Sequence, residues 1–435
     1  AVGDNPFGST AAREEYLFAY AVTLARAQER SAAKRALLRY AEEHPAGSHN
    51  GEVYFALGQM YKDEGKIDLA STYLQQAATM KQGTDALRDA ADLLLDSGKH
   101  ARAIDAYTRL AENSTEPAER RYAESRIVVA MLRAGKLSDA ASAIERFRSA
   151  WPEAEAEQDE FMLERGKYHH RAGEYRAAQD LFDDVEDSDI RALAALGSYW
   201  NGRCLEAQSR NSDAREQYGD VIEEYPGTEA ALESMMSLGR MAMRAEQYQD
   251  AATQYRAVVD AESIPDAMRK EALNGLISAY DVMGMYDVAA EMTRRFLEAW
   301  PGDPTAFRKR VNLGIFLTQL RYFDTAIDHL ESLLAEASPD DQAEIRYYIG
   351  EAYFYKHDFT QAALEFLKVP YLVVGKTEID WASAAYAQAG ECYRELSKFD
   401  LAIDMYQKVV DTKGVDPRFR AEAEKRIKEI RALMN

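Results

Sequence analysis

The chain has 435 residues, and its 74 acidic side chains outnumber 53 basic ones, which gives a formal net charge of -21. That excess argues against nucleic-acid binding, which needs a cationic footprint for the phosphates, and it disfavours anionic membrane surfaces. No run approaches the roughly eighteen apolar residues of a membrane-spanning helix, so we expect no direct membrane insertion.

One alanine recurs in a shared local phrase about every 37 residues along the chain. The phrase reads GKIDLASTY around Ala70, GEYRAAQDLF around Ala178 and SKFDLAIDMY around Ala402. Self-similarity at such a period is the signature of a repeat array. The eleven positions are Ala33, Ala70, Ala103, Ala140, Ala178, Ala214, Ala251, Ala289, Ala326, Ala362 and Ala402.

Twelve residues before each alanine stands a second small or aliphatic residue, and most of these are glycine. An apolar stripe at helical spacing, then a break that often contains glycine, predicts a helix, a turn and a helix in each unit. Glycine inside a helix costs about 1 kcal/mol relative to alanine, so its recurrence indicates two helices that cross closely. The positions are Ala21, Gly58, Ala91, Val128, Gly166, Gly202, Gly239, Ile277, Gly314, Gly350 and Gly390.

These residues resemble the tetratricopeptide repeat, whose pattern of Leu, Gly or Ala, Tyr, Ala, an aromatic residue and Pro they follow. The resemblance implies an all-α fold, a right-handed α-solenoid of about eleven helix-turn-helix units with a C-terminal capping helix. Val128, Ile277 and Thr293 depart from the pattern, so we expect the units at 121 and 270 to be wider or locally irregular. The expected parts are an N-terminal tail at 1–13, the solenoid at 14–416 with repeats starting near 14, 51, 84, 121, 159, 195, 232, 270, 307, 343 and 383, and the capping helix at 417–435.

The step into the last repeat is longer than the others, because it contains the segment 370–381. Pro370 cannot continue the preceding helix. Leu372, Val373 and Val374 then either fold back onto the solenoid as extra core or offer an apolar edge to a partner.

No motif of an active site, a nucleotide site or a metal site occurs in the sequence. The adjacent His169 and His170 would point about 100° apart on a helix, which does not suit chelation. Cys204 and Cys392 lie at equivalent places five units apart, so we expect free, buried thiols. We therefore expect no enzyme, no cofactor and no metal.

The resemblance implies protein partners, because tetratricopeptide arrays bind segments of other proteins along a concave face lined by the first helix of each unit. The ninth position of each unit should point to that face. The residues there are Val22, Gln59, Asp92, Val129, Lys167, Arg203, Arg240, Ser278, Ile315, Glu351 and Glu391.

Three successive bases at this position, Lys167, Arg203 and Arg240, predict a basic column in an acidic protein. Such a column would bind acidic side chains or a C-terminal carboxylate of a partner. Alternatively, glutamates neutralise these bases in weak surface pairs. The residues expected beside the column are His170, Arg171, Tyr199 and Arg244, and the glutamates of the alternative are Glu160, Glu164, Glu206 and Glu233.

A second candidate surface lies in the tenth unit, in the phrase YYIGEAYFY. Tyr347, Phe354 and Tyr355 fall on phases that face the groove, and exposed aromatic residues often dominate binding energy. Ordinary packing between repeats is the alternative.

The linkers between units carry phrases such as EHPAGSHN, EYPGTEA and AWPGDPTA. They resemble the linkers of bacterial extracytoplasmic tetratricopeptide proteins, which implies an extracytoplasmic or periplasmic location; the alternative is cytoplasmic. We therefore expect a non-enzymatic scaffold or adaptor in a bacterial envelope assembly. A permanent subunit of a larger machine and the helical body of an envelope enzyme are the alternatives, and the sequence leaves the oligomeric state open.

Overall fold

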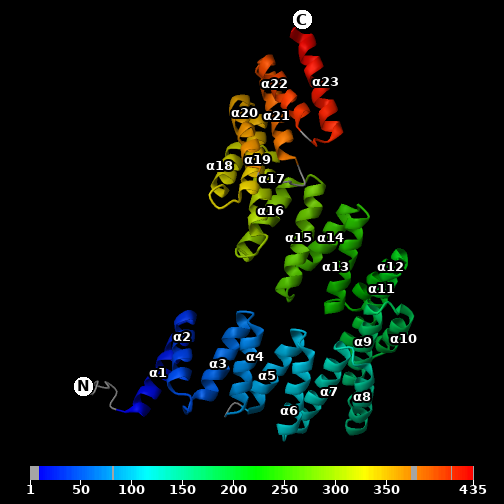
Figure 1. The fold of residues 1–435 in the computed structure, drawn as a ribbon. Helices are drawn as coiled ribbons and strands as arrows, with labels where there is room; N and C mark the ends of the chain where they lie inside the picture. Colours follow the sequence, from blue (N-terminus) through cyan, green and yellow to red (C-terminus); the bar gives the residue numbers. More distant parts are fainter. Residues whose placement is uncertain (1–8, 81–82, 374–379, 413, 435) are drawn as a thin grey trace, which may run out of the picture. The chain divides into compact units, whose positions relative to one another are not determined.

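The computed structural model describes residues 9–80, 83–373, 380–412 and 414–434. These residues form twenty-three α-helices and one short 3-10 helix, and they contain no β-strand (Figure 1). Eleven helix pairs follow one another, each made of a first helix, helix A, and a second helix, helix B. The all-α repeat fold expected from the sequence is therefore confirmed.

The A helices are α1 (Thr10–Arg26), α3 (Asn50–Asp63), α5 (Gly83–Asp96), α7 (Pro117–Arg133), α9 (Glu155–Arg171), α11 (Arg191–Ala207), α13 (Glu229–Arg244), α15 (Asp266–Val282), α17 (Ala306–Gln319), α19 (Pro339–Tyr355) and α21 (Trp381–Glu395). The B helices are α2 (Arg30–Glu43), α4 (Ile67–Ala78), α6 (His100–Asn113), α8 (Leu137–Ala150), α10 (Tyr175–Glu186), α12 (Asn211–Glu224), α14 (Tyr248–Val259), α16 (Tyr286–Ala299), α18 (Phe323–Leu333), α20 (Phe359–Lys368) and α22 (Phe399–Asp411). The short helix η1 (Val369–Tyr371) follows α20, and α23 (Pro417–Met434) is the final helix.

The chain divides into two compact units, unit 1 up to Ser234 and unit 2 from Met235 onward, and the boundary falls within α13. In unit 1, α9 contacts both α7 and α11, and in unit 2, α19 contacts both α17 and α21. These A helices thus pack side by side within each unit, and we call the solvent side of the A helices in either unit its helix-A face. The right-handed sense of the whole array stays a prediction.

Each of the eleven helix pairs turns through one residue with left-handed backbone geometry, with φ between 55° and 78°. Glycine adopts this region without steric cost because it lacks a Cβ. Five of these residues are the glycines of the predicted breaks, Gly65, Gly98, Gly135, Gly173 and Gly284; the other six are Gln28, Ser209, Glu246, Arg321, His357 and Ser397.

The recurring glycines of helix A lie where helix B crosses closely. A Cβ on any of them would lie 2.4–2.9 Å from a side-chain atom of the residue sixteen positions later. Because real Cβ contacts do not come this close, a larger residue would force the helices apart. The pairs are Gly58 with Leu74, Gly166 with Phe182, Gly202 with Tyr218, Gly239 with Tyr255, Gly314 with Leu330, Gly350 with Phe366 and Gly390 with Tyr406.

The two units that depart from the pattern have a larger residue than usual in helix A and a non-aromatic residue opposite it in helix B. Val128 in helix A is matched sixteen residues later by Ile144, and Ile277 by Thr293, and all four residues are buried. The Thr293 hydroxyl donates a hydrogen bond to the Ala289 carbonyl oxygen at 2.7 Å. In these two units, the larger residue of helix A therefore lies opposite a residue of helix B that is smaller than a Phe or Tyr ring. The expected widening of these units stays a prediction.

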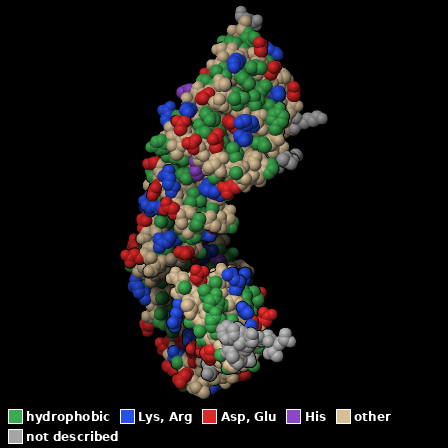
Figure 2. Space-filling view, turned by 90° about the vertical axis from the view of Figure 1, so that its left-hand side faces the viewer, with side chains coloured by type: hydrophobic (Ala, Val, Ile, Leu, Met, Phe, Trp, Pro, Cys, Tyr) green, Lys and Arg blue, Asp and Glu red, His purple; other side chains and the backbone are tan. Residues whose placement is uncertain are grey.

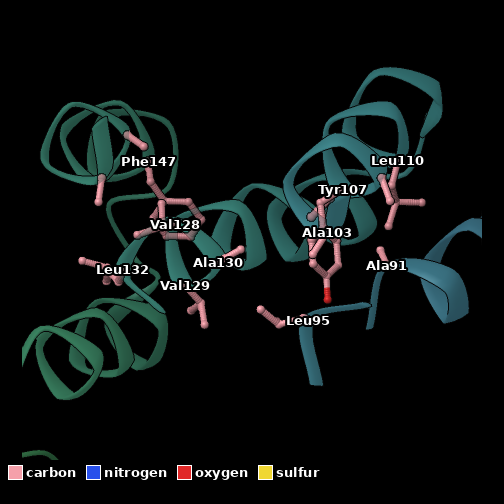
Figure 3. Close-up of a cluster of buried hydrophobic side chains, with 14 of the residues drawn as sticks. Ala91, Leu95, Ala103, Tyr107, Leu110, Val128, Val129, Ala130, Leu132 and Phe147 are labelled. Carbon is pink, nitrogen blue, oxygen red and sulfur yellow. The ribbon is translucent and has the colours of Figure 1, made fainter. Parts of the chain in front are cut away.

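The core of unit 1 runs between the helix pairs. Figure 3 shows Tyr107 of α6 beside Ala91 and Leu95 of α5, and Phe147 of α8 beside Val128 of α7. All five residues are buried. None of the helices in the described ranges is long and apolar enough to cross a membrane.

In unit 2, α23 covers the last repeat. Ile427 and Ile430 pack with Tyr406 and Val409 of α22 in one buried cluster. This packing confirms the expected capping helix.

The linker that follows α20 adds to the core of unit 2. Leu372 and Val373 pack against the cluster that contains Phe366 and Trp381, as one of the two alternatives predicted, whereas Val374 lies outside the described residues.

The two cysteines behave as expected. Cys204 in unit 1 and Cys392 in unit 2 are buried and free of disulfide bonds. Burial raises the pKa of each thiol to about 12, so both stay protonated and unreactive at neutral pH.

Candidate partner-binding surfaces

Trp200 of α11 stands among basic and aromatic side chains of α9 and α11 in unit 1. The Lys167 Nζ lies 5.6 Å from the centre of its ring system, and the Arg203 guanidinium carbon lies 5.5 Å from it. The His170 ring stands edge-on to Trp200, with ring centres 5.3 Å apart. We call Lys167, His170, Arg171, Tyr199, Trp200 and Arg203 the basic-aromatic cluster.

Lys167 forms an ion pair with a buried carboxylate, that of Glu164. Its Nζ lies 3.1 Å from Glu164 Oε1, and Arg133 of α7 pairs with the same carboxylate at 3.0 Å. Burial on its own would raise the pKa of Glu164, but Lys167 and Arg133 outweigh burial and hold this pKa below its ordinary value. Glu164 therefore pairs with two bases. The neutralising alternative named Glu164 as a partner of the predicted column, but it did not include Arg133.

Arg203 has a weaker contact with a carboxylate than Lys167 has. Its Nη1 donates to the Tyr199 hydroxyl oxygen at 3.0 Å, and its Nε lies 4.0 Å from Glu206 Oε2. A distance of 4.0 Å is too long for a hydrogen bond. The Arg203 guanidinium, which has five N–H groups, thus keeps donors that can bind an anion.

The local potential around His170 is positive. Burial lowers the pKa of His170, and the charges of Arg203 and Arg171 lower it further, while a hydrogen bond to the Arg203 carbonyl oxygen opposes them. Arg171 is exposed at the end of α9 and makes no ion pair within the described residues. This part of the helix-A face is therefore suited to anionic groups.

The other two predicted bases belong to unit 2. Arg240 donates to Glu271 at 2.8 Å and to the Ser237 hydroxyl at 3.0 Å. Arg244 lies in the last turn of the same helix, α13. Because the predicted column extends over both units, its continuity from Lys167 to Arg240 stays a prediction.

The three aromatic residues of repeat 10 have different surroundings. Tyr347 packs between repeats, with its ring centre 5.3 Å from that of Phe366 and 5.2 Å from that of Trp381. Tyr355 is 46% exposed, and Phe354 lines a pocket. The packing alternative thus describes Tyr347 and also Phe354, which packs against the same cluster while lining the pocket, whereas Tyr355 is exposed.

That pocket, of about 510 Å³, lies between α19, α21, α22 and α23 of unit 2, and we call it the terminal pocket. Its lining combines apolar side chains with charged ones, among which Arg426 forms ion pairs with Glu391 and Glu422. The lining residues are Phe354, Ala387, Gln388, Glu391, Tyr406, Arg418, Phe419, Glu422, Ala423 and Arg426.

Reasoning from the sequence missed three of the residues that shape these surfaces. Trp200 lies three positions before Arg203, so helical spacing could have placed both on one face. Arg133 and Phe419 carry no comparable signal, because they reach the two surfaces from α7 and α23.

Family models of the tetratricopeptide repeat match residues 55–117, 88–155, 163–228, 236–304 and 383–414. No curated protein matches the chain in sequence. Solved structures include a tetratricopeptide repeat protein from Parabacteroides merdae, 14% identical with a TM-score of 0.35, covering 64% of this chain and 99% of that one. YrrB, described as a TPR protein with an unusual peptide-binding site, is 21% identical with a TM-score of 0.33, covering 48% and 99%. MamA from Desulfovibrio magneticus is 17% identical with a TM-score of 0.34, covering 41% and 93%.

Proposed function

The chain belongs to the tetratricopeptide repeat family, and from that premise we propose that it is a non-enzymatic protein-interaction scaffold whose unit 1 binds acidic segments of partner proteins. The basic-aromatic cluster carries this proposal. With their partners, the cluster residues comprise four permanent cations, Arg133, Lys167, Arg171 and Arg203, against three carboxylates, Glu164, Glu206 and Glu233, the last of which accepts a hydrogen bond from Tyr199 at 3.5 Å.

Charge and shape act together at this cluster. A carboxylate can receive the remaining N–H groups of Arg203, because charge-assisted hydrogen bonds are stronger than neutral ones. Trp200 is only half-buried and offers an apolar surface to a neighbouring side chain of the same partner segment. The net charge of -21 repels acidic ligands elsewhere on the surface, so the position of the charges makes the site selective.

A selection from a displayed library of random peptides tests the proposal. We expect peptides retained by the full chain, but not by the Lys167→Glu/Arg203→Glu variant, to be enriched in Asp and Glu. The affinity of one such peptide, measured by fluorescence anisotropy at low salt, should fall at least about tenfold in this variant, or about 1.4 kcal/mol.

The matched control reverses two bases on the B helices of the same repeats. Arg176 of α10 and Arg215 of α12 are exposed, and Arg176→Glu/Arg215→Glu makes the same change in net charge. An equal loss of affinity in both variants would reduce the effect to general electrostatics and overturn the proposal.

We also propose that this scaffold acts outside the cytoplasm, within a bacterial envelope assembly. The support is the resemblance of linkers such as EHPAGSHN and AWPGDPTA to those of extracytoplasmic tetratricopeptide proteins. Fractionation of the native organism, with an antibody against the chain, should recover it with the envelope fractions. Recovery with the cytoplasmic fraction would contradict this location.

A further inference from the structure

Three of the ninth-position residues on the helix-A face are acidic, and two of them accept hydrogen bonds from neighbouring side chains. Asp92 accepts hydrogen bonds from the hydroxyl groups of Tyr107 at 2.6 Å and Tyr122 at 2.8 Å. Glu391 accepts from Tyr406 at 2.7 Å and from Arg394 at 2.7 Å. The third, Glu351 of α19, makes no hydrogen bond or ion pair within the described residues of the chain.

The sequence explains why Glu351 lacks partners. Glu391 receives the hydroxyl of Tyr406, fifteen residues later in helix B, and the guanidinium of Arg394, three residues later. The corresponding residues for Glu351 are Phe366 and Phe354, and neither can donate a hydrogen bond. Two phenylalanines thus leave this carboxylate without an internal donor.

Basic side chains of α19 and of the preceding A helix, α17, pair with other carboxylates. Arg346 of the same helix donates to Glu365 at 2.8 Å, and Arg308 of α17 donates to Glu344 at 2.5 Å. Burial is the sole cause that raises the pKa of Glu351 to about 7, and no neighbouring charge offsets it.

Aromatic rings surround this carboxylate instead. Burial is the largest cause that raises the pKa of the hydroxyls of Tyr347, Tyr348 and Tyr355, and the charge of Glu351 adds to it in each case, so all three lie close to Glu351. Phe354, one helical turn further along α19, lines the terminal pocket. The Tyr347 hydroxyl also hydrogen-bonds to Gln388, another residue of that lining. Glu351 therefore lies close to residues of the pocket lining.

We propose that Glu351, Tyr355 and the terminal pocket form a receptor in unit 2 for a partner segment in which a Lys or Arg side chain is followed by a large apolar side chain. The cation pairs with the unpartnered carboxylate and lies against the tyrosine ring, an arrangement that stabilises cations in partly desolvated sites. The apolar side chain enters the pocket between Phe354 and Phe419. This inference rests on the proposed scaffold function and gives unit 2 a partner chemistry opposite to that of unit 1.

The same library of displayed peptides tests this receptor. Peptides retained by the full chain but released by the Glu351→Gln variant should contain a Lys or Arg beside Leu, Ile, Met or an aromatic residue. The control, Asp404→Asn, makes the same change in charge on the exposed side of α22 and should release none of them. If Glu351→Gln released no peptides, or released peptides without a basic residue, the receptor would be refuted.

The pH dependence of binding supplies a second readout. The cation binds the ionised carboxylate, so the affinity of a selected, histidine-free peptide should fall about tenfold from about pH 8 to about pH 6, and Glu351→Gln should abolish this dependence. Glu391, whose pKa is lowered, and the tyrosines, whose pKa values are raised, do not titrate in this range. His357 lies in the turn that follows α19, so the profile is repeated with the His357→Asn variant and should not change. A pH dependence that persists in Glu351→Gln would contradict the proposal.

The folded state of the variant can be checked independently. A raised carboxyl pKa means that Glu351 favours the folded state below its ordinary value of 4.5 and that this contribution is lost as the pH rises through about 7. Glu351→Gln should therefore raise Tm at about pH 8 and leave it nearly unchanged near pH 4.5. A loss of stability at both pH values would show that Glu351 has an internal partner, against the proposal.

The two proposals fail in distinguishable ways. If the unit 1 reversals release acidic peptides and Glu351→Gln releases nothing, only the receptor in unit 2 is wrong. If neither variant changes which peptides are retained, the scaffold function proposed for the helix-A face is wrong as well.

Discussion

The turn between the two helices of each repeat depends on one residue with left-handed backbone geometry. A residue with a Cβ in this region is strained by about 1–2 kcal/mol. Arg321 adopts a φ of 65° in the turn from α17 to α18, and its side chain is exposed. Six of the eleven turns thus carry a strain that glycine would relieve, although glycine also gains more freedom in the unfolded chain.

We therefore expect Arg321→Gly to raise the free energy of unfolding by up to about 1 kcal/mol. The reverse change, Gly98→Ala, should lower it by about 1 kcal/mol, because no atom lies within 4 Å of the added Cβ and only backbone strain remains. Urea denaturation measures both. Arg321→Ala, which keeps the Cβ, is the control and should bring no gain; an equal gain in both Arg321 variants would exclude backbone strain as the cause.

Single residues of the candidate surfaces were predictable as far as helical spacing extends. Lys167 and Arg203, both at the ninth position of their units, lie against the same ring of Trp200, which helical spacing also includes. Their ion-pair partners were harder to predict, since Glu164 is shared with Arg133 from the preceding repeat. Geometry between repeats, which sequence spacing does not describe, decides such pairings.

The helix pair is the element whose structure the sequence describes best. A short turn links the A and B helices of each pair, so in seven units one glycine and one Leu, Phe or Tyr sixteen residues later specify the crossing. The terminal pocket is different, because it depends on how α23 packs against α21 and α22. Amphipathic spacing predicts that a final helix covers the last repeat, but not the shape of the space that it leaves.

The complementary sizes at each crossing can be tested with a double-mutant cycle. A Cβ on Gly314 would lie 2.4 Å from Leu330 Cδ2, so Gly314→Val should overpack the crossing of α17 and α18 by about 1–3 kcal/mol. Leu330→Ala should leave a cavity and cost about 2–5 kcal/mol.

The double variant nearly restores the total volume and imitates the exchange seen at Ile277 and Thr293. It should therefore be more stable than the sum of the single changes predicts, with a coupling of about 0.5–3 kcal/mol. Urea denaturation of the four proteins measures the coupling. Strictly additive changes would show that Gly314 and Leu330 do not share the same space.

At the scale of the whole molecule, both signs of charge are present on the surface in large numbers, with the acidic side chains in excess. Figure 2 shows acidic and basic side chains interspersed over the visible surface. Many join neighbouring repeats, as in the pairs of Arg88 with Glu119 and of Lys270 with Asp303. Each exposed pair contributes only about 0–1 kcal/mol, while an excess of 21 negative charges acts on every part of the chain.

These two effects respond to salt in opposite directions. Salt weakens exposed ion pairs, and it also screens the repulsion among the surplus carboxylates, which disfavours the compact state. Because the repulsion is a sum over the whole chain and the pairs are individually weak, screening should dominate. We expect Tm, followed by circular dichroism, to rise when NaCl is increased from about 10 mM to about 150 mM. Binding of an acidic peptide to the basic-aromatic cluster should weaken over the same range, because that contact is attractive. A Tm that falls with salt would show that the ion pairs between repeats outweigh the net charge and contribute a large part of the stability of the array.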